Sequence, residues 1–276
     1  MLYQVGGIRG IAHAGVLKAL EDNNITIDII GGTSSGSMVA MLYASGYSPY
    51  NIYTLFKKYS NEIVSINTKP LIKSYMFSKK ITLKGLKTGK SVEKVFNEVI
   101  NKQGIFKMTD IKMPIVVPTV DLMDCREYVF TNNPPKDEAK YITNIEVGKA
   151  VRASSSFSAV FSPCNFEKHA FIDGGALDNI PVKEVKKQGA DIVIAVKFNS
   201  DTIKEDSNIM DMTMKTIDIM GNKIAEENLS QADYILNVYT DKTGLLDIKK
   251  ADSCYRYGYE AVSKNIENIR NLICKL

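Results

Sequence analysis

The sequence predicts an α/β fold in which helices cover both faces of a central sheet, and three observations support this. Short apolar segments typical of buried strands alternate with segments that have the apolar spacing of helices. No internal repeat and no proline-rich linker interrupts the 276 residues. A hydrophobic content of 45% is ample for a buried core. We therefore expect one domain over residues 1–276.

The first half of the chain has two strand–loop–helix units. A strand at residues 2–5 is followed by the glycine loop 6–10 and a helix over residues 11–21 that ends at two asparagines. A second apolar run at residues 27–30 enters a tight turn, and a small-residue helix leaves it. Further elements follow from apolar spacing, namely helices at 49–59 and 91–102, a buried strand at 113–122 and its antiparallel neighbour at 126–131.

The second half continues the alternation. A helix at residues 144–152 leads into a small-residue stretch, 153–161, and a strand from residue 169 ends in Asp173 and two glycines. The remaining elements are a helix ending near residue 189, buried strand 190–197, a helical region within 200–230, strand 234–239 and an amphipathic helix at 253–274.

The turn at residues 32–36 reads Gly-Thr-Ser-Ser-Gly, a G-x-S-x-G pattern between the strand and the helix. Gly32 and Gly36 permit a sharp turn that exposes Ser34, and the helix N-terminus adds positive potential. This context predicts a nucleophile elbow centred on Ser34. The alternative is an ordinary turn before a helix.

The glycine loop that includes Gly6, Gly7, Ile8, Arg9 and Gly10 also precedes a helix. Backbone N–H groups in such a loop suit an anion or an oxyanion. A nucleotide site is disfavoured, since the loop lacks the Walker lysine–serine pair and a full G-x-G-x-x-G. Arg9 either holds the loop or meets a substrate phosphate, and Arg152 is similarly open.

A nucleophilic serine needs a base, and the chain has only two histidines. His13 lies among small and apolar residues and is expected to be packed. His169 would complete a triad with Ser34 and an acid, Asp121 or Asp124. The direct alternative is that Asp173 accepts the Ser34 proton; otherwise Asp173 only caps the turn at Gly174 and Gly175.

Taken together, the glycine loop, the elbow and the Asp173-Gly174-Gly175 motif resemble the patatin-like phospholipases in order and rough spacing, most strongly over residues 1–200. Residues 201–276 would complete the domain. The resemblance implies a three-layer α/β/α fold with a mostly parallel central sheet. It also implies lipid acyl hydrolysis by a Ser34–Asp173 dyad, with an oxyanion hole from Gly6, Gly7 and Ile8. The supporting residues are Arg9, Gly10, Gly32, Gly36, Gly174 and Gly175.

The sequence departs from the family pattern at two positions. Val5 stands where the first of three loop glycines is usual, and Ser158 replaces a proline common in the small-residue segment. These departures bear on the fine geometry of the pocket.

Charge is unevenly spread along the chain, whose net charge is +4. Between Lys57 and Lys90 the sequence has nine lysines and a single acid, Glu62, and apolar residues are interleaved with them. This basic segment either contacts an anionic membrane surface or is simply solvated.

The sequence shows no signal peptide and no apolar run long enough for a membrane span, so we expect a cytoplasmic protein with peripheral membrane contact. The four cysteines are widely spaced, and neither a metal nor another cofactor is expected. Nucleic acid is not an expected partner.

The resulting hypothesis is a cofactor-free serine hydrolase of lipid esters, of the phospholipase A or lysophospholipase type, acting through an acyl-enzyme. Two alternatives stay open. One is a catalytically silent lipid-binding or scaffolding protein with the same fold, and the other is an esterase that uses His169 in a triad.

Overall fold

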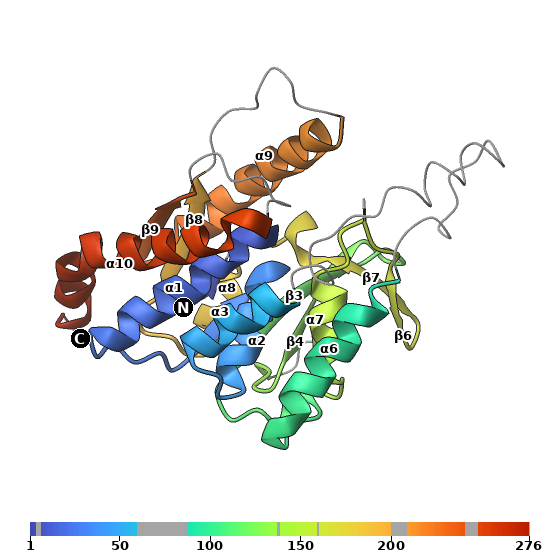
Figure 1. Ribbon diagram of the computed structural model, residues 1–276. Coiled ribbons are helices and arrows are strands. Elements are labelled where there is room, and N and C mark those ends of the chain that lie inside the picture. Colours follow the sequence, from blue (N-terminus) through green and yellow to red (C-terminus); the bar gives the residue numbers. More distant parts are fainter. Residues whose placement is uncertain are drawn as a thin grey trace.

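A nine-stranded sheet forms the centre of the computed structural model, which describes residues 1–3, 7–59, 88–136, 139–158, 160–199, 209–240 and 248–275 (Figure 1). The strands are β1 (Leu2–Tyr3), β2 (Ile30–Gly32), β3 (Ile115–Asp121), β4 (Arg126–Thr131), β5 (Tyr141–Ile142), β6 (Cys164–Phe166), β7 (His169–Asp173), β8 (Ile194–Asn199) and β9 (Tyr234–Tyr239). Their order is β5-β4-β3-β2-β1-β8-β9, and β7 pairs with both β3 and β6.

The sheet is mixed. The run from β9 through β8, β1 and β2 to β3 is parallel, as is the pairing of β4 with β5. The pairings of β3 with β4 and β7, and of β6 with β7, are antiparallel. The mostly parallel description thus fits one side of the sheet only. Short turns explain two of these antiparallel pairings, because they return the chain directly after β3 and after β6.

Helices cover both faces of this sheet, which confirms the expected layered α/β class. One core contains buried side chains from α1 (Ile11–Asp22), α2 (Ser35–Ala44), α3 (Pro49–Lys58), α6 (Lys90–Ile100), α7 (Val147–Ser154) and α10 (Ala251–Ile273). A second core joins α8 (Val182–Lys187) and α9 (Ile209–Leu229) to the sheet. Successive residues of β3, Val116 and Val117, belong to different cores, as the alternation of side chains along a strand requires.

The first and last helices pack backbone against backbone. A methyl group added at Gly15 of α1 would lie 1.9 Å from the carbonyl oxygen of Tyr255, and one added at Gly258 of α10 would lie 1.9 Å from that of Ala12. Only glycine permits this approach. The contact supports the proposal that residues 1–276 form one domain.

Most expected elements are present, with ends shifted by a few residues. The prediction missed β5 and β6, strands of two and three residues that are too short to show alternation. The basic segment is mostly outside the described residues, as are Val5 and Gly6. In the described part of the chain, no helix combines the length and the apolar character needed to span a bilayer.

Candidate active site

The predicted site lies where β2 and β7 meet end to end along β3. β4 occupies one edge of β3 from Val116 to Asp121, so β2 and β7 share the other edge. β2 runs parallel to β3 and β7 runs antiparallel, which points their carboxyl ends at each other. A methyl group added at Gly174 would lie 2.4 Å from the Pro118 carbonyl oxygen and 3.0 Å from the Thr33 methyl group. The turns that carry Ser34 and Asp173 are therefore in contact.

Ser34 occupies a strained backbone conformation at the start of α2. Its φ of 56° and ψ of −121° lie outside the regions that residues other than glycine usually adopt. The turn is held because the N–H groups of Gly36 and Ser37 donate to the carbonyl oxygens of Thr33 and Ser34, each at 2.9 Å. Gly32 is required by space, since a methyl group there would lie 2.5 Å from the Gly36 carbonyl oxygen. The geometry is that of the predicted elbow.

Asp173 is buried beside the elbow, with 7% of its surface exposed. Its Oδ1 accepts a hydrogen bond of 2.9 Å from the Gly175 N–H, whereas its Oδ2 has no hydrogen-bond partner among the described residues. Burial raises the pKa of Asp173 to about 6, against the smaller lowering effects of the Ser34 hydroxyl and the Gly175 N–H. A carboxylate with this pKa is ionised near neutral pH yet basic enough to take a proton.

The glycine loop borders the same site. Residues Gly7–Gly10 form a short 3-10 helix, and a methyl group added at Gly10 would lie 2.7 Å from the Cβ of Ser35. Ile8 is fully buried. Gly6 lies outside the described residues, so the complete loop that was predicted as the oxyanion hole stays a prediction.

Arg9 is 2% exposed, and its guanidinium lies over the Phe198 ring, 5.8 Å from the ring centroid. This position favours a role in holding the loop over a contact with a substrate phosphate.

The two histidines have different surroundings. His13 is fully buried and stacks on Phe198, with ring centroids 4.5 Å apart, as expected of a packed histidine. His169 Nδ1 lies 2.6 Å from Asp121 Oδ2, so the acid–histidine pair of the triad alternative does form. However, His169 begins β7 and Asp173 ends it, which places them about 13 Å apart. Phe171 lies between them on the same face and stacks on His169. The pair is therefore remote from the elbow.

The resemblance to the family predicts the small-residue stretch 153–161 near the dyad, but two sets of residues near the site were not singled out individually from the sequence. Ser154 and Ser156, within the small-residue segment, contact Ser34 and Asp173 respectively. Behind the elbow, Thr33 Oγ1 donates to the Asp178 carbonyl oxygen at 2.9 Å, and the Asp178 carboxyl accepts from Asn228. The sequence held only a weak signal for these contacts, because each joins residues that belong to different elements of the fold.

Asp178 lies near two further acids, Glu127 and Glu184, which share Lys140 as an ion-pair partner. Lys140 Nζ lies 3.3 Å from a Glu127 oxygen and 2.8 Å from a Glu184 oxygen. Burial and the neighbouring acids Glu127 and Glu184 raise the pKa of Asp178 well above its usual range. The ion pairs of Lys140 tie the start of β5 to β4 and α8.

Comparisons with known proteins agree with this architecture. The profile described as "Patatin-like phospholipase" matches residues 5–186. The chain is 33% identical over 199 residues to "Lysophospholipase NTE1" of Scheffersomyces stipitis, covering 71% of this chain and 11% of that protein. It is 30% identical over 280 residues to "Lysophospholipase NTE1" of Candida albicans, covering 92% of this chain and 19% of that protein. The chain thus spans a small part of these relatives.

A solved structure shares the fold at low sequence identity. VipD from Legionella pneumophila superposes with a TM-score of 0.54 at 14% identity, covering 96% of this chain and 66% of that chain. The profile match covers more than half of the sequence and shows that the chain belongs to the patatin-like phospholipase family.

Proposed function

We propose that this chain is a serine acyl hydrolase of lipid esters, with Ser34 as nucleophile and Asp173 as its base. One observation carries the proposal: the turn that holds a strained serine at a helix N-terminus contacts the turn of a buried carboxylate, and one oxygen of that carboxylate has no partner among the described residues. Strained backbone and a buried group with a shifted pKa are both typical of catalytic sites.

In the proposed first step, Asp173 takes the Ser34 proton as Oγ attacks the ester carbonyl carbon. The carbonyl oxygen becomes an oxyanion, and the N–H groups of the loop containing Gly6, Gly7 and Ile8 would stabilise it. The N-terminus of α2 adds positive potential at the same place. Cleavage of the ester C–O bond then returns the proton from Asp173 to the departing alcohol and leaves an acyl-Ser34.

In the second step, Asp173 takes a proton from water, whose oxygen attacks the acyl carbon. Collapse of this second tetrahedral species breaks the bond to Oγ, returns the proton to Ser34 and releases the fatty acid. A single carboxylate serves both steps, so no histidine is required.

The names of the relatives suggest the substrate class. Two of them are called lysophospholipases, and the family description names phospholipases. We therefore propose a phospholipid or lysophospholipid ester as substrate.

The proposed membrane contact rests on the basic segment between Lys57 and Lys90, most of which lies outside the described residues. At its start, Lys57 is engaged in an ion pair of 2.8 Å with Asp252. The contact would place the site next to its lipid substrate.

The dyad is tested with Ser34→Ala and Asp173→Asn, assayed on a short-chain ester and on lysophospholipid, with a fluorophosphonate probe as a second readout. We expect both variants to lose turnover by at least about 10³-fold, and Ser34→Ala to lose labelling altogether. Full turnover in either variant would remove the dyad. A folded wild-type protein that is neither labelled nor active would instead indicate the silent lipid-binding protein.

A further inference from the structure

One short segment contacts both residues of the proposed dyad. Ser154, the last residue of α7, accepts a hydrogen bond through its Oγ from the Ser34 N–H at 3.1 Å. Two residues later, the carbonyl oxygen of Ser156 accepts a hydrogen bond from the Asp173 N–H, also at 3.1 Å. The separation of the elbow and the acid is thus fixed by a third element as well as by their direct contact.

The contact with Ser34 is the more consequential of the two. The Ser34 N–H belongs to a residue held at a positive φ and is buried, so the loss of its acceptor would leave an unpaired donor in the interior. Strained backbone persists only where its surroundings hold it. Ser154 itself is fully buried, which keeps its hydroxyl in place.

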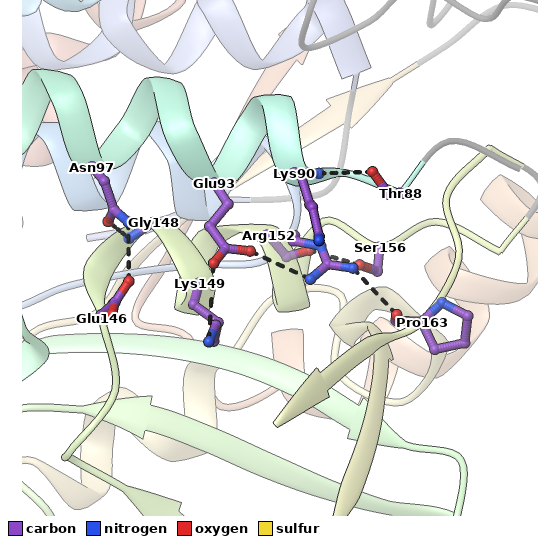
Figure 2. Close-up of polar contacts among 10 residues, drawn as sticks. All are labelled: Thr88, Lys90, Glu93, Asn97, Glu146, Gly148, Lys149, Arg152, Ser156 and Pro163. Carbon is purple, nitrogen blue, oxygen red and sulfur yellow. Dashed lines mark hydrogen bonds and ion pairs between the residues drawn. The ribbon is translucent and has the colours of Figure 1, made fainter. Parts of the chain in front are cut away.

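This segment is anchored to α6 by a partly buried ion pair (Figure 2). Arg152 lies 3.3 Å from the Glu93 carboxylate and donates to the Pro163 carbonyl oxygen at 3.3 Å. Its own carbonyl oxygen accepts from the Ser156 hydroxyl at 2.8 Å. Arg152 therefore holds the chain on both sides of Ser154 and Ser156.

A second pair of contacts fixes α7 along α6. The Gly148 N–H donates to Asn97 Oδ1 at 2.8 Å, and Asn97 Nδ2 donates to Glu146 at 3.1 Å (Figure 2). These contacts hold the first turn of α7 against α6, as Arg152 holds its last turn.

We infer that Arg152, Ser154 and Ser156 form a bracket that sets the position of Ser34 relative to Asp173, with Ser154 and Arg152 as positioning residues. The inference rests on the proposed dyad. In this inference Arg152 positions the site residues and does not bind a substrate phosphate.

The test compares Ser154→Ala with Ser155→Ala in the full chain. Ser155 is the matched control, since it is the neighbouring serine, it is also buried, and its Oγ has no hydrogen-bond partner among the described residues. The readouts are kcat and KM on a short-chain ester, the rate of fluorophosphonate labelling, the pH profile and the melting temperature.

For Ser154→Ala we expect kcat and the labelling rate to fall by about 10²-fold, because a small displacement of a reacting group has this effect. KM should stay within about twofold of the wild-type value, since no substrate contact is removed. The acid limb of kcat/KM should move to higher pH, because the Ser34 hydroxyl that lowers the pKa of Asp173 would be displaced. A purely structural role for Ser154 would move the melting temperature and leave this limb unchanged.

Ser155→Ala should match the wild type in all four measurements. If Ser154→Ala fails to fold, Ser154→Cys, which is close in volume and a weak acceptor, gives the same comparison. Arg152→Lys should change kcat and the acid limb in the same direction as Ser154→Ala, because lysine lacks the planar fork that spans Glu93 and Pro163.

Equal kinetics for folded Ser154 and Ser155 variants, with an active wild type, would overturn the bracket and leave the dyad standing. A wild type that is neither labelled nor active would overturn both.

Discussion

Replacing Asp173 by asparagine should stabilise the protein at neutral and alkaline pH while abolishing the proposed activity. The carboxylate is buried, and its pKa is raised from 3.8 to about 6. Asparagine has nearly the same shape, and its Oδ1 can still accept the hydrogen bond from the Gly175 N–H. The variant therefore removes the cost of a buried charge at little cost in packing.

The magnitude follows from proton linkage. Below about pH 3.8 the carboxyl is neutral in both the folded and the unfolded chain, so it contributes no pH dependence. Between pH 3.8 and about 6 the unfolded chain ionises first, and the free energy of unfolding falls as pH rises. A shift of about two units corresponds to at most about 3 kcal/mol. The advantage of the variant should thus grow from near zero at pH 4 to about 2–3 kcal/mol at pH 8.

Urea denaturation of wild type and Asp173→Asn at pH 4, 6 and 8 measures this difference. Asp110→Asn is a control of opposite sign, because the N–H groups of Lys107 and Phe106 lower the pKa of Asp110. Its carboxylate therefore stabilises the fold above its unfolded pKa. A stability difference for Asp173→Asn that does not change with pH, or a loss of stability at pH 8, would refute the assigned burial and pKa.

Two further predictions concern residues outside the dyad. His169→Gln should keep ester turnover within about threefold of wild type, because His169 lies about 13 Å from Asp173 along β7, whereas the unfolding free energy should fall by about 1–3 kcal/mol through loss of the Asp121 contact. A turnover loss comparable to that of Ser34→Ala, with the fold intact, would restore the triad. Binding to vesicles that contain phosphatidylserine should weaken at an ionic strength of about 0.5 M and on replacing Lys79 and Lys80 by glutamate, because screened surface charges attract less. Binding that is indifferent to salt would contradict a role for the basic segment.

Local patterns were sufficient where the physics is local. The elbow at Ser34 was predictable because a tight turn between a strand and a helix needs small residues at fixed spacing, and Gly32 and Gly36 supply them. The place of Asp173 at the end of a strand was predictable because an apolar run ends there in an acid and two glycines.

The triad alternative shows the limit of such patterns. The order of Ser34, Asp121 and His169 satisfied a known arrangement, and the latter two residues do form a close pair. Only the pairing of β7 with β3 shows that Asp121 and His169 lie at the opposite end of β7 from Asp173. Register of this kind depends on contacts between residues far apart in sequence.

The sequence by itself determined the family, the elbow and the chemical types of the candidate residues, because glycine spacing and residue chemistry are properties of short segments. Tertiary structure decided which acid meets Ser34, because β2 and β7 converge only when both pair with β3. It also decided the contacts of Ser154 and Arg152, since hydrogen bonds between buried groups follow from the packing of α7 against α6 and the sheet.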